Sequence, residues 1–284
     1  MKLSGGFEKM IRNIVGQKMW IGLICLLSLL IFSGCAGTDK GKTAAAPAAV
    51  EANSLRIGVT PSAPPLVFYQ EGRVAGIEAD FANALAQSLG KTPRFVVLAW
   101  DDLMPALLEK RIDIIMSGMS VTRLRETRIN FTSPYLKAGQ MALVRNQDVS
   151  SYPSASAIKN TEHRVGFMKG TTGDFLVQKE FQLTTRKIPY TMTKDAVQAL
   201  IEERIDMVIG DAPVIWWNAT AKEPQGLMLI PIFLTEENLA WGVRKDDTAL
   251  LESANRFLET WKSSGKLKST IKQWIPSAPA ERIP

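Results

Sequence analysis

Apolar and polar residues follow one another in blocks that predict strands and helices in turn. Short apolar runs rich in branched residues, at 56–59 and 94–99, predict buried strands. Segments with apolar residues at three- and four-residue steps, at 78–89 and 101–110, predict amphipathic helices. The first of these has acidic residues in its first turn and Gly90 just past its end, as helix termini do. Strands that alternate with helices indicate largely parallel sheets.

The chain also repeats itself. Residues 107–118 read LLEKRIDIIMSG and residues 200–211 read LIEERIDMVIGD, so that helix, strand and loop recur in step. The strand at 56–59 (RIGV) is likewise echoed at 164–167 (RVGF). Chance similarity of short elements is one explanation. If the repeat is real, the chain forms two α/β lobes whose loops, at the carboxyl ends of the strands, face one shared crevice.

The segments after residue 236 indicate where one lobe ends and the other resumes. The segment 237–244 (ENLAWGVR) predicts a strand that crosses back to the first lobe, and 246–261 predicts a helix packed on that lobe. Two strand crossings would then act as a hinge. The predicted division is as follows: lobe 1 at 54–144 and 239–276, lobe 2 at 145–238, and a C-terminal tail at 277–284.

The first 34 residues predict an export signal. Basic residues precede an uncharged apolar stretch at 19–32, which ends in Ser-Gly before Cys35. This arrangement is similar to a bacterial lipoprotein signal and predicts lipidation of Cys35, although a plain signal-anchor helix remains the alternative, and a start at Met10 is also compatible. Residues 35–53 are small and polar and predict a flexible tether of roughly 25 Å. We therefore expect a protein in the periplasm or at the cell exterior, anchored to a membrane.

Charge and composition narrow the possible functions. Segment 1–34 contributes half of the formal net charge of +6, so the remaining excess does not indicate nucleic-acid binding. Cys25 lies inside the apolar stretch, which leaves Cys35 as the single thiol of a processed chain and excludes disulfides and cysteine nucleophiles. With one histidine, His163, a zinc site or a histidine-based triad is hard to assemble. We expect no metal and no cofactor.

The most informative stretch is the loop after the buried strand at 112–116. Three of its small residues offer backbone N–H groups and hydroxyls: Ser117, Gly118 and Ser120. A helix that opens near Thr122 would add unpaired N–H donors and a positive dipole end. Arg125 could then close on a carboxylate with a two-pronged hydrogen bond. The alternative is a capped surface helix whose Arg125 is merely solvated.

From residue 55 to residue 274 the chain resembles the family 3 extracellular solute-binding proteins, the substrate-capturing subunits of polar amino-acid ABC transporters. The resemblance is carried by these segments in order: GIEAD (76–80), WDDLMPALL (100–108), RIDIIMSGMSVTRLR (111–125), FTSPY (131–135), KGTTGD (169–174), the Asp211 loop, and SGKLKSTIKQW (264–274). Any one of them is weak, but the ordered set is specific.

The resemblance implies an α/β, two-lobed periplasmic-binding-protein fold of type II, monomeric, which closes on an amino acid and delivers it to a permease. In relatives an arginine at the Arg125 position, groups like those of 117–120 and the amide matching Thr172 hold the α-carboxylate, and an acid at the Asp211 position holds the α-amino group. An aromatic residue at the Trp100 position lies against the ligand side chain. From the residues alone, Asp211 before Ala212-Pro213 is well placed as a helix N-cap, and core packing is the alternative for Trp100.

Some residues depart from the family pattern. Ala63 stands where many relatives have a second aromatic wall, and Thr60 stands where binders of basic amino acids have an aspartate. Gly173 replaces a polar residue, and Glu78, which we also place at the site, stands where aspartate is more usual. A neutral or modestly sized ligand is therefore expected in preference to lysine or arginine. Two further residues, Trp216 and Trp217, either rim the opening or pack inside a lobe.

A rival prediction is an enzyme, because the same fold hosts dehydratases of the cyclohexadienyl or arogenate type. Such chemistry needs a positioned acid or base. His163 precedes a strand, at the end away from the loops, and Glu78 is the other acid to consider. A ligand-sensing domain is a third possibility. The sequence does not identify the ligand, its affinity, or the membrane that holds the lipid.

Overall fold

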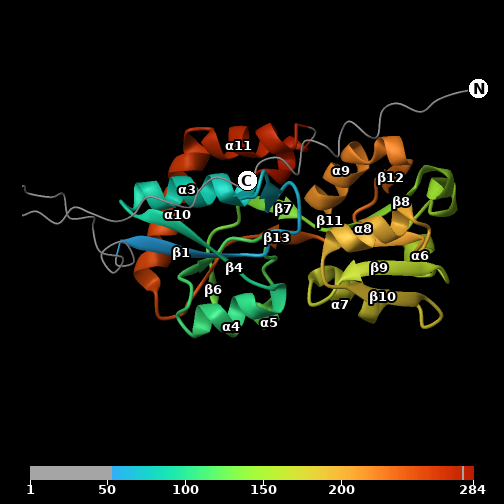
Figure 1. Cartoon of the computed structure of the whole chain (residues 1–284), viewed down its shortest axis with the longest axis horizontal. Coiled ribbons are helices and arrows are strands. Elements are labelled where there is room, and N and C mark those ends of the chain that lie inside the picture. The colour runs from blue at the N-terminus through green and yellow to red at the C-terminus, as the bar shows by residue number, and fades with distance from the viewer. Residues whose placement is uncertain (1–52, 277) are drawn as a thin grey trace, which may run out of the picture. The chain divides into compact units, whose positions relative to one another are not determined.

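The computed structural model describes residues 53–276 and 278–284, which fold into two lobes (Figure 1). Each lobe is built around a five-stranded sheet flanked by helices. The predicted export signal, Cys35 and nearly all of the tether lie outside the described residues. In the part of the chain that is described, no helix is both long enough and apolar enough to span a membrane.

The first lobe has a sheet with the strand order β4-β1-β5-β14-β6. These strands are β1 (Ser54–Val59), β4 (Thr92–Val97), β5 (Ile114–Ile115), β6 (Asn130–Phe131) and β14 (Gly242–Val243). The helices around it are α3 (Ile77–Ser88), α4 (Leu103–Leu108), α10 (Thr248–Ser263) and α11 (Lys266–Trp274). β1 pairs in parallel with β4 and β5, whereas β14 is antiparallel to both of its neighbours. The sheet is therefore mixed, and its parallel part is the part that the helix–strand pattern predicts.

The second lobe has the strand order β10-β9-β11-β8-β12. Its strands are β8 (Gln140–Arg145), β9 (Arg164–Met168), β10 (Arg186–Tyr190), β11 (Met207–Asp211) and β12 (Leu227–Ile230). Its helices are α6 (Ala155–Lys159), α7 (Thr172–Glu180), α8 (Thr193–Ile201) and α9 (Ala212–Ala221). Again two pairings are parallel, and the two made by β8 are antiparallel. The strand orders of the two lobes match position by position.

The repeated sequence produces a repeated ion pair. In the first lobe Arg56 donates from Nε and Nη2 to the two carboxylate oxygens of Asp113, at 3.1 and 2.6 Å. In the second lobe Arg164 donates in the same way to Asp206, at 2.9 and 2.7 Å. Burial by itself raises the pKa of the Asp206 carboxyl, but the hydrogen bonds from Arg164 hold it well below its usual range. The echo is thus a structural repeat and not a chance similarity.

The lobes are joined by two antiparallel strands, β7 (Leu136–Ala138) and β13 (Glu237–Leu239), which lie between them in Figure 1. β8 begins two residues after β7 and belongs to the sheet of the second lobe. The prediction that the first lobe extends to residue 144 is therefore wrong. The apolar run that suggested it is a strand buried in the second lobe, and the boundary lies near Gly139.

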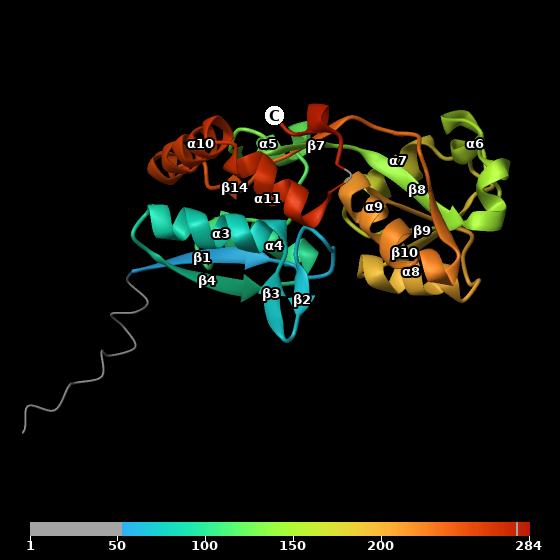
Figure 2. The ribbon, with the colours of Figure 1, turned by 90° about the horizontal axis from the view of Figure 1, so that it is seen from above.

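Two surface features of the fold are not evident from the sequence pattern. A hairpin of β2 (Phe68–Gln70) and β3 (Arg73–Ala75) precedes α3, and Figure 2 shows it at the side of the first lobe toward α9. Its Phe68 ring lies 5.9 Å from that of Trp217 in the second lobe. The C-terminal residues also pack, because Arg282 pairs with Glu236 at 2.6 Å beside the connecting strands. Both features tie the lobes together at their periphery.

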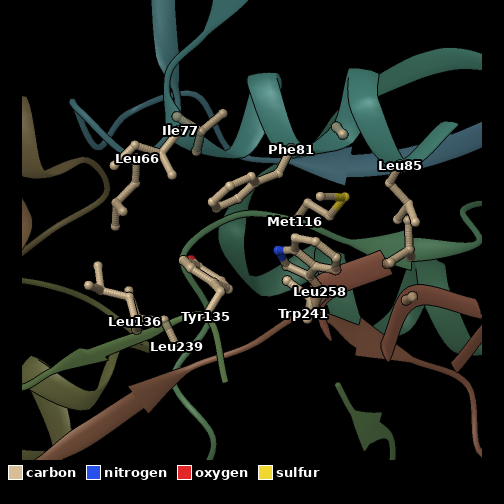
Figure 3. Close-up of a cluster of buried hydrophobic side chains, with 14 of the residues drawn as sticks. Leu66, Ile77, Phe81, Leu85, Met116, Tyr135, Leu136, Leu239, Trp241 and Leu258 are labelled. Carbon is tan, nitrogen blue, oxygen red and sulfur yellow. The ribbon is translucent and has the colours of Figure 1, made fainter. Parts of the chain in front are cut away.

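The core of the first lobe reaches the connecting strands. Figure 3 shows Phe81 of α3 directed toward Tyr135 and Trp241, whose ring centroids lie 5.4 and 5.8 Å away. All three side chains are fully buried. Aromatic pairs in this geometry contribute about 0.5–1.5 kcal/mol each beyond the burial of their area. Because Tyr135 immediately precedes β7, this cluster fixes the point at which the chain leaves the first lobe.

Candidate functional site

A cavity lies between the lobes, and the empty space in and around it, open solvent included, is about 580 Å³. The first lobe contributes Thr60, Ser62, Ala63, Leu66, Trp100, Ser117, Gly118, Ser120 and Arg125 to its wall. The second lobe contributes Gln140, Met168, Thr171, Thr172, Thr193, Ile209, Gly210, Asp211 and Val214. Arg125 and Asp211 are the charged residues among these described lining residues. One positive and one negative side chain therefore face the cavity, each from a different lobe.

Arg125 is buried and held in place from both lobes. Its Nη1 donates to the Ser120 carbonyl at 2.8 Å, and its Nη2 donates to the Gly170 carbonyl of the second lobe at 3.4 Å. The guanidinium carbon lies 5.4 Å from the centroid of the Trp100 ring, within reach of a cation–π contact. Burial lowers the pKa of the guanidinium, while the negative charges of Asp211 and Glu237 oppose that shift. An arginine stays protonated in such a site, and its fork of donors suits a carboxylate.

The helix that carries Arg125 is very short. α5 covers only Arg123–Glu126, a single turn, and the Thr122 side chain already caps it by accepting from the Arg125 N–H at 3.2 Å. The prediction that this helix supplies a positive dipole end is therefore wrong, because the dipole effect needs several aligned peptide units. The positive character of this wall comes from the guanidinium itself.

The loop before α5 is shaped by its small residues. Gly118 has φ 69°, and a Cβ atom at this position would lie 2.7 Å from the Leu66 side chain. The positive φ favours glycine, and any larger residue would also have to displace the end of the Leu66 side chain. Ser117 accepts a hydrogen bond from the Thr60 N–H at 2.9 Å, and Ser120 is nearly fully buried. The structure thus brings all three predicted loop residues to the cavity wall.

Glu78 does not line the cavity, which corrects its prediction as a ligand contact. It is fully buried and accepts hydrogen bonds from the Gly118 N–H at 2.6 Å, the Tyr135 hydroxyl at 2.7 Å and the Trp241 indole at 2.9 Å. Burial raises the pKa of its carboxyl to about 7, although these hydrogen bonds act in the opposite direction. Because its carboxylate oxygens already accept these hydrogen bonds from the protein, the role of Glu78 is to hold the Gly118 loop in place.

Asp211 ends β11 and precedes α9. It occupies the N-cap position of α9, but its side chain makes no capping hydrogen bond. Instead Oδ1 accepts from the Gln140 Nε2 at 2.6 Å, at the cavity wall. Burial and the nearby charge of Glu237 raise the pKa of the Asp211 carboxyl to about 7. Of the two alternatives left open by the sequence, the geometry favours the cavity.

Thr172 and Trp100 both lie where a ligand could reach them. Thr172 is the first residue of α7, and the Thr171 side chain caps that helix. The first N–H groups of a helix have no partner inside it, so they can donate to an anion. Trp100 lines the cavity, and its indole N–H donates to the Gly170 carbonyl across the lobes at 3.0 Å. It therefore belongs to the cleft and not only to the core.

Other candidates lie elsewhere. Trp216 packs against Phe233 at 6.0 Å and Trp217 against Phe68, and neither is among the residues that line the cavity. His163 pairs with the Tyr152 hydroxyl at 2.7 Å, outside the cavity. Within residues 53–276 and 278–284, no group of three or more His, Cys, Asp and Glu side chains could hold a metal ion.

Several cavity residues are not singled out by the sequence pattern. They are Ser62, Leu66, Gln140, Met168, Thr171, Thr193, Ile209, Gly210 and Val214. Most are apolar or small side chains that read as ordinary strand and helix positions. Gln140 had one possible signal, a polar residue at the start of an apolar strand just after a glycine.

Two α/β lobes that are joined by two strands and line a shared cavity are typical of two-lobed ligand-binding proteins. The chain matches the family of bacterial extracellular solute-binding proteins, family 3, over residues 55–277, and it belongs to that family.

Two curated relatives and one solved structure illustrate the similarity. The chain is 32% identical to a "Probable histidine-binding protein" of Neisseria gonorrhoeae, over 89% of this chain and 93% of that protein. It is 27% identical to "ABC transporter arginine-binding protein 1" of Escherichia coli, over 79% and 92% of the two chains. Among solved structures it resembles the ancestral amino acid-binding protein AncCDT-1, a precursor of cyclohexadienyl dehydratase, with a TM-score of 0.73, 28% identity, and coverage of 79% and 96%.

Proposed function

We propose that the protein captures a free amino acid outside the cytoplasm by closing its two lobes, and delivers it to the permease of an ABC transporter. The observation that carries this proposal is that Arg125 and Asp211 reach one cavity from opposite lobes. An amino acid at neutral pH presents a carboxylate and an ammonium a few ångströms apart. Arg125 matches the first and Asp211 matches the second. Two relatives are named as histidine- and arginine-binding proteins, which supports an amino acid as the class of ligand.

Binding should be strongest in the closed form. Each lobe supplies one of the two charges, so neither lobe by itself holds both ends of a zwitterion. Trp100 and Arg125 already contact Gly170 across the gap. A ligand that bridges the lobes would add to these contacts and shift the population toward closure.

We further propose that the ligand has a neutral side chain. Apart from Arg125 and Asp211, the cavity wall described here is made of hydroxyl, amide, thioether and apolar groups. Thr60 offers no carboxylate, and Ala63 leaves one side of the cavity without an aromatic wall. This proposal contrasts with the relatives named for histidine and arginine. It rests on the side chains that line the cavity, among which only Arg125 and Asp211 are charged.

The positions of the possible acids and bases favour a binding protein over an enzyme. Glu78 is sealed behind the Gly118 loop, and His163 lies outside the cavity. A general acid must lie within hydrogen-bond reach of the substrate. The resemblance to a dehydratase precursor makes an enzyme the second candidate. Incubation with prephenate and with arogenate distinguishes the two, because an aromatic product would support the enzyme.

The membrane anchor is a separate proposal. Lipidation of Cys35, a tether through residue 53 and a monomeric binding unit would keep the protein close to its permease. Metabolic labelling with a fatty acid tests the anchor, and Cys35→Ala should abolish the label.

The direct test of function is a calorimetric screen of the purified protein. The panel is L-glutamine, L-alanine, L-histidine, L-cystine, L-arginine and L-lysine, with mass spectrometry of any ligand that co-purifies. We expect at least one neutral amino acid to bind and to be recovered unchanged. Tight binding of lysine or arginine in preference to the neutral ligands would overturn the proposal for the side chain. The absence of binding by the whole panel, together with no amino acid in the co-purified material, would overturn the proposed function.

A further inference from the structure

Gln140 occupies a particular position in the fold. It is the first residue of β8, directly after Gly139, so it stands where the connecting strand β7 enters the second lobe. Its side chain is 1% exposed and forms part of the cavity wall. Its backbone N–H donates to the Thr235 hydroxyl at 2.9 Å, just before the other connecting strand. The residue therefore joins the cavity to both strands between the lobes.

The amide nitrogen of Gln140 is fully used. It lies 2.6 Å from Asp211 Oδ1, 3.0 Å from the Thr172 hydroxyl and 3.2 Å from Glu237 Oε1. These are acceptors, and two of them belong to carboxylates. The reverse orientation of the amide would place its oxygen against both carboxylates, so the hydrogen-bond network itself fixes which atom is nitrogen.

The amide oxygen of Gln140 has no partner. Among the described residues, Oε1 is buried and accepts no hydrogen bond, and the Oε2 of neighbouring Glu237 is in the same condition. Oε1 lies over Gly173, because a Cβ atom at that position would be only 2.8 Å away. A buried acceptor without a donor is costly. Next to Asp211, it provides a second place for a ligand N–H.

We propose that Gln140 is a ligand-binding residue whose Oε1 accepts an N–H of the ligand ammonium beside Asp211. This inference rests on the proposed function. An ammonium carries three N–H donors, and one carboxylate oxygen leaves two of them to be satisfied. Gln140 Oε1 supplies the second acceptor at the same wall. The Gln140 amide would thus have two roles. Its Nε2 orients the Asp211 carboxylate through a hydrogen bond, and its Oε1 adds an uncharged acceptor for the ammonium.

The test uses the tightest binder of the amino-acid panel and its 2-hydroxy acid analogue, which lacks the ammonium. Calorimetry gives the ratio of their affinities for the wild type, for Gln140→Leu and for Gln198→Leu. The last variant is the control, because Gln198 lies exposed on α8 and pairs with Glu202. We expect Gln140→Leu to weaken amino-acid binding about tenfold to a hundredfold, with a smaller effect on the hydroxy acid. Gln198→Leu should leave both affinities unchanged. Gln140→Ser replaces Gln140→Leu if thermal melting shows that the latter is unfolded.

A second comparison separates contact from positioning. If Gln140 acts only by orienting Asp211, its substitution should have no further effect on the affinity ratio once Asp211→Asn is present. If it contacts the ammonium, the ratio falls again in the double variant. Equal losses for both ligands, or no additional loss in the Asp211→Asn background, would overturn the inference while leaving the proposed function intact. Failure of every amino acid to bind the wild type would instead refute the proposed function itself.

Discussion

The raised pKa of Asp211 predicts that ligand binding depends on pH near neutrality. In the empty cavity, burial and the charge of Glu237 raise the pKa of this carboxyl to about 7. An ammonium needs the ionised carboxylate, so the bound form favours loss of the proton. The liganded protein therefore holds fewer protons than the empty one, and affinity must rise with pH until the carboxyl is ionised in both. Arg125 acts in the opposite direction, because its charge lowers the pKa of Asp211.

The size of the effect follows from the titration. With a pKa of about 7, roughly one site in ten is ionised at pH 6 and about nine in ten at pH 8. The affinity should therefore increase about tenfold between these values and change little above them until the ligand ammonium titrates. At pH 6 binding should also release nearly one proton per ligand.

Calorimetry in two buffers of different ionisation enthalpy measures both quantities. Asp211→Asn is the control, because it cannot titrate: its affinity is expected to be lower by about thirtyfold to several thousandfold, and independent of pH over this range. The reasoning would be refuted by a wild-type affinity that is flat from pH 6 to pH 8 with no proton release, or by an unchanged pH dependence in Asp211→Asn.

Three further predictions concern Glu78, Gly170 and Asp206. Glu78→Gln should destabilise the fold by about 1–3 kcal/mol in urea denaturation, because an amide cannot accept from all of its donors. The pKa of Glu78 is raised from 4.5 to about 7, so its contribution to stability is lost as pH rises through that interval, and Glu78→Gln should flatten this decline. Gly170→Val should weaken ligand binding without unfolding the lobes, because a Cβ atom would lie 2.5 Å from Asp101 at φ +75°; unchanged affinity would contradict it. Asp206→Asn should lower the urea midpoint by removing the charged partner of Arg164, and an unchanged midpoint would show that the repeated pair is not stabilising.

The sequence predicts the architecture well where the signal is local or repeated. The α3 helix, with acids in its first turn and Gly90 after it, matches the predicted segment to within a residue or so. The duplicated RID segments also predict two lobes. The β2–β3 hairpin is not evident, because its strands are only three residues long and partly exposed. The misplaced lobe boundary has a similar cause, since an apolar strand carries no mark of the sheet that it joins.

The residues of the site also differ in how far the sequence indicates them. Ser117 and Arg125 can be found from their place after a buried strand, Asp211 is indicated only by the family resemblance, and the structure brings all three to one cavity. Glu78 cannot be assigned in this way, because only the tertiary packing of Tyr135 and the loop around it shows that its carboxylate is already occupied. Gln140 owes its position to the crossing of the chain between lobes, which no local pattern encodes.

The most direct measurement compares the two ends of the ligand in two variants. The tightest-binding amino acid, its amide without a carboxylate and its 2-hydroxy acid without an ammonium are titrated into the wild type, Arg125→Gln and Asp211→Asn. If Arg125 and Asp211 hold the two ends of one zwitterion, each variant loses one preference and keeps the other. Arg125→Gln no longer prefers ligands that have a carboxylate, and Asp211→Asn no longer prefers ligands that have an ammonium. If both variants discriminate among the three ligands as the wild type does, these residues do not grip the ligand, and the proposed mode of binding is wrong.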